Sequence, residues 1–147
     1  MVLLSGPEPQ RNILEALLLK KLRYYKGRVL FVRGLVEPIQ SKTKNDNITL
    51  VNFMQSIELE QAIAESELIL SRSGYTTLLD LSKMEKKAFF IPTPGQFEQE
   101  YLAQRLDDKK ISPSCTQDKF TLDELKRVSF YSGFKSIKSE TNFEKLF

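Results

Sequence analysis

The 147-residue sequence contains no histidine and only one cysteine, Cys115. Without histidine the chain cannot form a Ser-His-Asp triad, a Cys-His catalytic pair or a His-ligated zinc site. A single cysteine allows neither an internal disulfide nor a metal site built from several cysteines, and it suits a reducing compartment. We therefore expect Cys115 to be an inert side chain.

Other patterns are also missing from the sequence. No apolar run approaches the length of a membrane-spanning helix, and no signal-peptide pattern is visible. The chain has neither the GxxxxGK[ST] nor the GxGxxG phosphate-binding motif, and it has no Asp-X-Asp motif to hold a metal. The net charge is only +3 and no basic stripe carries interleaved aromatic residues, so we expect no nucleic-acid partner.

What the chain does contain is an alternation of short apolar runs and segments with helical spacing. The runs VLFV, ELIL and AFFI are apolar throughout, as is typical of strands buried on both faces of a parallel sheet. We therefore predict a Rossmann-like, doubly wound parallel α/β domain with about six strands and helices on both faces. The expected strands are residues 2–4, 28–35, 48–53, 67–70, 88–91 and 111–115, and the expected helices are 12–25, 57–66, 76–84, 97–106 and 122–131.

The expected domain occupies residues 1–131. The polar stretch 37–46 contains a proline, so we expect a surface loop there. Residues 132–147 are polar with scattered Phe and Leu, and we expect them to form a C-terminal tail or helix. Because the first strand starts without preamble, we expect the chain to be one part of a longer protein.

The residues just after each strand are the candidates for a binding site, because ligands of open parallel sheets bind beyond the carboxyl ends of the strands. After the first strand, SGPEPQR places Gly6 and Arg11 at the start of a helix, where the helix dipole attracts an anion. Pro7 and Pro9 carry no N–H, however, and a plain tight turn explains this loop about equally well.

A second loop, SRSGYTT at residues 71–77, precedes the helix expected at 76–84. Ser73 can cap that helix, Gly74 lets a ligand approach the backbone, and Thr76 and Thr77 add hydroxyl groups. Capping alone would explain a serine and one threonine, but it does not explain Arg72 and the glycine as well.

Asp80 lies farther along the same expected helix, on its first turns. A carboxylate there can accept two hydrogen bonds from the hydroxyls of a ribose. A favourable interaction with the positive end of the helix dipole is an equally good explanation of Asp80.

Two more loops carry candidate residues. After the strand expected at 88–91, Gln96 and Gln99 offer neutral amides, which can donate and accept hydrogen bonds with sugar hydroxyls. After the strand expected at 48–53, the backbone of Phe53 and Met54 could pair with a flat base while apolar side chains pack on the ring. A place at the edge of the core is the simpler alternative for Phe53.

The segment from residue 53 to residue 107 resembles the C-terminal domain of the MurG-type glycosyltransferases of family 28. The similarity lies in a Ser-Gly loop after an apolar strand, an acidic residue on the following helix, a Pro-containing loop and a Gln-bearing helix. Here these features are Ser73-Gly74, Asp80, Pro92 and Gln99. The resemblance implies a GT-B fold, in which two Rossmann-like domains face each other, and it implies that this chain is the C-terminal one.

The same resemblance implies a site for a UDP-sugar. It places uracil at Phe53 and Met54, ribose at Asp80, the diphosphate and sugar at the start of the helix after Ser73, and sugar hydroxyls at Gln99. The full set of donor-binding residues expected is Gly6, Arg11, Phe53, Met54, Arg72, Ser73, Gly74, Tyr75, Thr76, Thr77, Asp80, Gln96 and Gln99. The first loop departs from the family's glycine-rich run, Asp80 stands where a longer Glu is usual, and Glu100 replaces a second glutamine.

The activity implied is inverting transfer of a hexosyl group, with N-acetylhexosaminyl as one form, to an acceptor hydroxyl. Helix N-termini and Arg11 or Arg72 would stabilise the departing UDP, without a metal or cofactor. The general base and the site for an acceptor glycan or lipid-linked sugar would lie in an N-terminal domain that this chain does not include. We expect a cytoplasmic enzyme of cell-envelope synthesis, and peripheral association with the inner face of the cytoplasmic membrane stays open. Two alternatives also remain: a UDP-sugar hydrolase or epimerase, and a non-catalytic nucleotide-binding module.

Overall fold

The computed structural model describes residues 1–37, 40 and 42–134, and the chain divides into two compact units, Met1–Ser71 and Arg72–Phe147. Most of the tail predicted at 132–147 therefore lies outside the described residues. The extent of the donor-binding domain, 1–131, stays a prediction.

The first unit is built on a parallel sheet with one antiparallel edge strand. Its parallel strands are β1 (Val2–Leu3), β2 (Val29–Val32), β4 (Ile48–Val51) and β5 (Ile69–Ser71), and its edge strand is β3 (Lys42–Asn45). The strands follow the order β3-β4-β2-β1-β5. The register places Val2 opposite both Phe31 and Leu70, and all three side chains are buried. The parallel strands are mostly apolar along their length because both faces of the sheet are covered.

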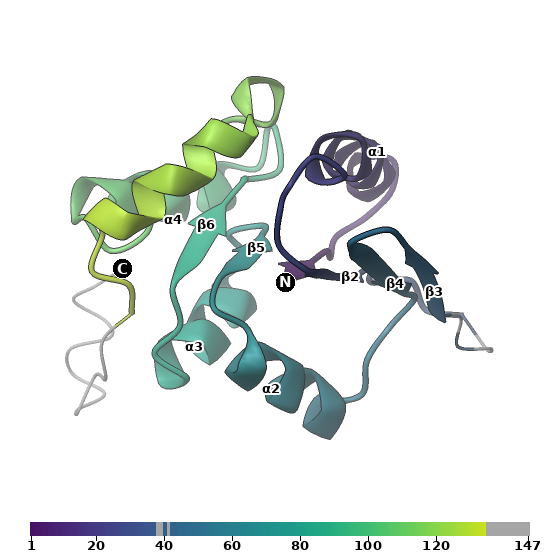
Figure 1. The fold of residues 1–147 in the computed structure, drawn as a ribbon. Coiled ribbons are helices and arrows are strands. Elements are labelled where there is room, and N and C mark those ends of the chain that lie inside the picture. Colours follow the sequence, from purple (N-terminus) through teal and green to yellow (C-terminus); the bar gives the residue numbers. More distant parts are fainter. Residues whose placement is uncertain (38–39, 41, 135–147) are drawn as a thin grey trace. The chain divides into compact units, whose positions relative to one another are not determined.

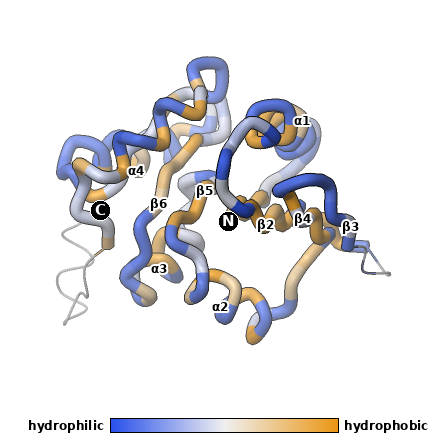
Figure 2. Tube along the Cα trace, viewed as in Figure 1, coloured by the Kyte–Doolittle hydropathy of each residue, from blue (hydrophilic) through white to orange (hydrophobic). Residues whose placement is uncertain are grey.

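Two helices cover this sheet from opposite sides, α1 (Gln10–Leu22) and α2 (Ser56–Glu65), as Figure 1 shows. The helix α1 buries Leu14, Leu18 and Leu22, which recur every four residues and so form one apolar stripe. Figure 2 shows how hydropathy varies along the chain: strands such as β2 are apolar, and outer segments such as β3 are polar.

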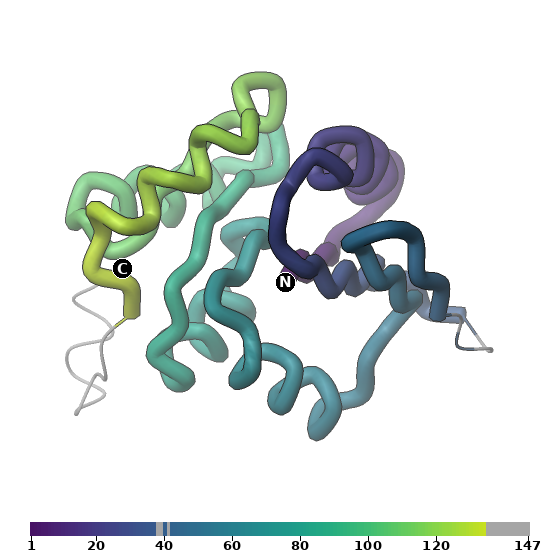
Figure 3. Tube along the Cα trace, viewed as in Figure 1, coloured from purple at the N-terminus to yellow at the C-terminus, as the bar shows by residue number. Residues whose placement is uncertain are grey.

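The loop predicted at 37–46 is wrong for residues 42–45, which form β3 and pair with β4 in a hairpin. Figure 3 shows the chain reversing between the two strands, at a turn where Asp46 has a φ of 51°. All four side chains of β3 are exposed, so the strand has no apolar pattern that could reveal it. Its two lysines suit an edge strand, because charge discourages pairing with other chains.

The described residues of the second unit form β6 (Ala88–Phe90), the α-helices α3 (Tyr75–Lys83) and α4 (Phe97–Asp108), and the 3-10 helices η1 (Gln117–Lys119) and η2 (Leu122–Phe130). Its core includes Phe89 and Phe120, which are fully buried and meet edge to face with ring centres 5.9 Å apart. The strand predicted at 111–115 is reduced to a single bridge between Phe90 and Ser114, and the predicted helix 122–131 is a 3-10 helix.

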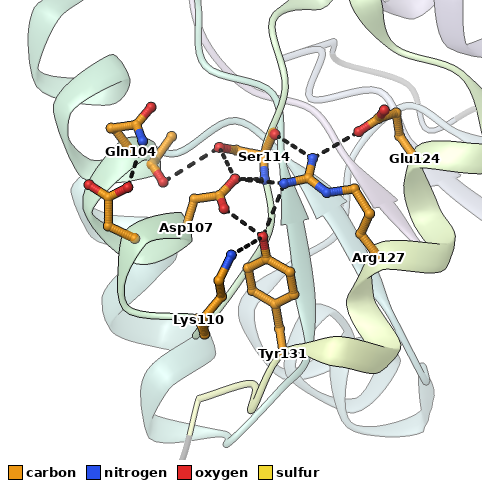
Figure 4. A network of polar contacts seen from close by, with 9 residues as sticks. Gln104, Asp107, Lys110, Ser114, Glu124, Arg127 and Tyr131 are labelled. Carbon is orange, nitrogen blue, oxygen red and sulfur yellow. Dashed lines mark hydrogen bonds and ion pairs between the residues drawn. The ribbon is translucent and has the colours of Figure 1, made fainter.

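A polar cluster fastens η2 to the end of α4 (Figure 4). The Asp107 carboxylate accepts hydrogen bonds from the Tyr131 hydroxyl, from the Arg127 guanidinium at 3.0 Å and from the Ser114 N–H at 3.1 Å. Arg127 also pairs with Glu124 at 2.8 Å. Along the described residues, the parallel strands alternate with helices at most steps, and this alternation confirms the predicted Rossmann-like α/β fold.

Candidate functional site

Ser73 joins the starts of α3 and α4 in the second unit. Its side chain is fully buried, and its hydroxyl donates a hydrogen bond to the backbone carbonyl of Gln99 at 2.8 Å. The prediction that Ser73 caps α3 is wrong, because the N-cap position is Gly74 and no side chain caps the helix. Ser73 instead holds the start of α3 against the first turn of α4.

The side chain of Gln99 fastens the loop between β6 and α4. Its Oε1 accepts a hydrogen bond from the Thr93 N–H at 2.8 Å, and its Nε2 donates to Oε1 of Gln96 at 3.0 Å. The neighbouring Glu100 accepts from the Gly95 N–H at 3.1 Å. The two predicted sugar-reading amides, Gln96 and Gln99, therefore lie together, although each already has a partner within the loop.

Arg72 also positions this loop. Its guanidinium is buried and donates to the backbone carbonyls of Ile91 and Pro92, at 3.2 and 3.1 Å. Burial lowers the pKa of Arg72 to about 10, so the side chain still carries its positive charge at neutral pH. The structure shows the hydrogen bonds of Arg72 to the loop, whereas contact of Arg72 with a phosphate stays a prediction.

The outer side of the α3 start is open. A Cβ added at Gly74 would meet no atom within 4 Å. The first intrahelical bond runs from the Leu78 N–H to the Gly74 carbonyl, so the N–H groups of Thr76 and Thr77 have no partner within the helix. These groups stand at the positive end of the helix dipole, where an anion is stabilised.

Asp80 lies on the exposed side of α3. It follows Thr76 by four residues and Thr77 by three, so the three side chains share one side of the helix. Within residues 1–37, 40 and 42–134, the Asp80 carboxylate has no hydrogen-bond or ion-pair partner. Tyr75, the first residue of the helix, is 45% exposed. A charged acceptor and two hydroxyls are thus left available beside the open helix start.

Arg11 in the first unit has a different setting from the one predicted for it. Its guanidinium is 4% exposed and pairs with Glu8 and Glu15, and it donates to the Arg33 carbonyl at 3.0 Å. Three protein acceptors surround the group that was expected to meet a phosphate. The structure therefore gives Arg11 a structural role, and its contact with a ligand stays a prediction.

Sequence reasoning missed the network around Arg11, which links α1 to the residues that follow β2 and β4. Glu15 also pairs with Arg33 at 2.9 Å, and Arg33 donates to Asn52 at 3.2 Å. Burial alone would raise the pKa of Glu15, but hydrogen bonds from Arg33 and Arg11 hold that pKa below its ordinary value. The sequence does carry a signal for this network. Glu15 directly follows Leu14 on the apolar side of α1, four residues after Arg11.

Two other predicted residue groups lie in the first unit. Gly6 is exposed, has a φ of +100° that favours glycine, and would meet no atom within 4 Å through an added Cβ. Phe53 and Met54, which are half-buried, follow β4 after Asn52. An open hollow begins at this point and is lined by Met54, Gln55, Ser56, Ile57, Glu58 and Gln61.

The family model described as the glycosyltransferase family 28 C-terminal domain matches residues 10–130. The chain belongs to this family. The expected similarity to family 28 glycosyltransferases is thereby confirmed over most of the sequence, and the GT-B type of Rossmann-like domain with it.

Two solved structures share the fold. The crystal structure of the glycosyltransferase SnogD from Streptomyces nogalater matches with a TM-score of 0.64 and 14% identity, over 86% of this chain and 34% of that one. The solution structure of ALG13 matches with a TM-score of 0.63 and 17% identity, over 99% of this chain and 92% of that one. The chain thus spans about a third of the SnogD chain but most of the ALG13 chain. No curated protein matches the sequence.

Two further observations bear on partners. No helix in the described part of the chain is both long and apolar enough to cross a membrane. Within the same residues, no three Cys, Asp or Glu side chains gather as metal ligands would.

Proposed function

We propose that the chain binds the UDP-sugar donor of an inverting glycosyltransferase that transfers a hexosyl group to an acceptor hydroxyl. The observation that carries this proposal is the 2.8 Å bond from Ser73 to the Gln99 carbonyl, which joins the N-termini of α3 and α4. Two helix N-termini held together attract a diphosphate more strongly than one, because both dipoles present their positive ends. Membership of family 28 supports the same conclusion.

The proposed diphosphate site is the open start of α3. The N–H groups of Thr76 and Thr77 and the space beside Gly74 would receive the phosphate oxygens. Asp80 would hold the two ribose hydroxyls, since its carboxylate is exposed and lies on the same side of the helix. Gln96 and Gln99 would read the hydroxyls of the sugar through the hydrogen-bonding capacity that their loop contacts leave unused.

In the first unit we propose that the backbone of Phe53 and Met54 meets the uracil. The hollow that starts at Met54 supports this assignment, because it offers apolar walls from Met54 and Ile57 next to the Phe53 backbone. Gly6 would allow close approach of the ligand to the first loop. Arg11 would act mainly by fixing the helix start that follows this loop.

The chemistry of this chain in the proposed reaction is stabilisation of the leaving group. Negative charge develops on the departing UDP, and helix N–H groups already oriented toward it lower the barrier without reorganising. Arg72 would add a positive charge behind the loop. We propose that this stabilisation needs no metal, and that the general base and the acceptor site are supplied from outside this chain.

The remaining assignments follow from the proposed activity. The acceptor would be a glycan or a lipid-linked sugar, and the enzyme would act in the cytoplasm in synthesis of the cell envelope. Peripheral association of the complete enzyme with the inner face of the cytoplasmic membrane belongs to the same proposal.

Titration calorimetry of UDP against the wild-type chain and Asp80→Ala tests the donor site. Loss of a hydrogen-bonded charged contact should weaken UDP binding by about 1.5–3 kcal/mol, or roughly 10- to 150-fold. The fold should persist, because Asp80 is exposed and alanine favours a helix. Asp123→Ala is the matched control, because its side chain is 85% exposed in the same unit and has no proposed ligand contact. Equal UDP affinities for the wild type and Asp80→Ala, or no UDP binding at all, would contradict the proposal.

A further inference from the structure

We infer that Gln40 is an internal substitute for the nucleobase: its side chain occupies the backbone edge of Phe53 and must leave before a base can bind there. This inference rests on the proposed function, since it concerns the same uracil site. It adds a residue that sets donor affinity by competing with the ligand.

The position of Gln40 follows from the register of the β3–β4 hairpin. In this antiparallel pair, Lys42 lies opposite Val51. Gln40 stands two residues before Lys42 and Phe53 two residues after Val51, so both lie just beyond the last pair of the hairpin. The hairpin that sequence reasoning missed is therefore the element that delivers Gln40 to the proposed base site.

The contact itself has two points. The Phe53 N–H donates to Oε1 of Gln40 at 3.3 Å, and Nε2 of Gln40 donates to the Phe53 carbonyl. One planar group thus satisfies both backbone atoms of Phe53 with an adjacent donor and acceptor. Uracil presents the same adjacent pair, its N3–H and a ring carbonyl, so the two groups compete for one backbone edge.

The Gln40 contact is easily replaced. Gln40 is exposed, so its amide can exchange the Phe53 backbone for water at little net cost. The adjoining hollow at Met54 to Gln61 leaves room beside Phe53 for a ring larger than a carboxamide. Gln40 therefore keeps the backbone of Phe53 hydrogen-bonded when no UDP-sugar is bound. A base can displace Gln40 because the base also makes contacts in the hollow.

Removing the side chain amide should tighten nucleoside binding. Gln40→Ala should bind uridine and UDP about fivefold more tightly than the wild type, the factor expected when one modest competing contact is lost. Binding of inorganic pyrophosphate should not change, because pyrophosphate has no base. Gln104→Ala, an exposed glutamine of α4 that bonds to Asp108, is the matched control and should leave all three affinities unchanged.

Amide hydrogen exchange measures the contact directly. In the free protein the Phe53 amide should exchange faster in Gln40→Ala than in the wild type, and saturating UDP should protect it equally in both. If the wild type binds UDP but Gln40→Ala binds uridine no more tightly than the wild type does, this inference alone is overturned. Absence of UDP binding to both proteins would overturn the proposed function and this inference with it.

Discussion

The two units differ in which of their candidate ligand groups the protein itself occupies. In the first unit Arg11 pairs with Glu8 and Glu15, and the Phe53 backbone bonds to Gln40. In the second unit Arg72, Gln96 and Gln99 also have protein partners, but the start of α3 is open at Gly74. The difference shows that a polar residue after a strand marks a binding edge only when its partners leave it accessible.

The placement of charge explains part of this difference. The first unit has an ion pair between Glu15 of α1 and Arg33, the residue that follows β2. The second unit keeps the pair of Asp107 and Arg127 at the C-terminal end of α4, whereas its candidate loop lies at the N-terminal end of that helix. The open helix start is therefore free of neutralising carboxylates from this cluster.

Arg11→Met tests whether the buried ion pairs of Arg11 serve the fold or the ligand. Of the proposed substitutions, it should have the largest effect on stability. Removing a buried guanidinium leaves Glu15 with only one of its two cationic partners, so the free energy of unfolding should fall by about 3 kcal/mol. Urea denaturation measures this loss. If Arg11 only holds the fold, UDP affinity at a temperature where the variant is folded should match the wild type. Normal stability with greatly weakened UDP binding would instead assign Arg11 to the ligand.

Gly74→Asp tests whether the open start of α3 receives the diphosphate. Aspartate is a better N-cap than glycine and has space here, so the free energy of unfolding should stay equal or rise. Its negative charge would face the diphosphate, however, and UDP binding should weaken by at least about tenfold.

Gly74→Asn is the control for that substitution, because asparagine caps the helix equally well without a charge. It should keep most of the UDP affinity. Similar weakening by both substitutions would show that space, not charge, matters at Gly74. No weakening by either would place the diphosphate elsewhere.

Asp107→Asn should have the smallest effect and should separate stability from binding. Burial alone would raise the pKa of Asp107, but bonds from Tyr131, Ser114 and Arg127 hold that pKa below its ordinary value. The charged carboxylate thus stabilises the fold above about pH 4, and this contribution is lost as the pH falls through the lowered pKa.

The variant should therefore lose about 1 kcal/mol at pH 7, and its stability should fall less than that of the wild type between pH 5 and pH 2. Urea denaturation across this pH range provides the measurement. UDP affinity at pH 7 should be unchanged, since Asp107 lies at the far end of α4 from the loop. A change in affinity would mean that the two ends of the helix are coupled.

The sequence predicted the elements whose burial is uniform. Strands such as β2 and β6 are apolar throughout, and α1 carries its leucines at helical spacing, so local pattern and environment agree. It failed at β3, where no side chain is buried and backbone pairing with β4 alone makes the strand. It also failed to distinguish a 3-10 helix from an α-helix at Leu122–Phe130, because a short amphipathic pattern fits both.

Whether the candidate residues bind a ligand stays a prediction, but some of their contacts could be compared with the structure. The start of α3 and the first turn of α4 meet through Ser73 and Gln99. Whether a side chain faces a ligand or the protein depends on contacts distant in sequence, such as Gln40 with Phe53. These contacts depend on strand register, which is set by the whole sheet rather than by a local motif.

Titration of the isotope-labelled chain with UDP, followed through the backbone amide signals, shows whether a nucleoside diphosphate binds at the open start of α3. We expect saturable shifts concentrated at Gly74, Thr76, Thr77 and Asp80. Saturable shifts that leave these four amides unmoved, or no shifts at millimolar UDP, would mean that the diphosphate does not bind there.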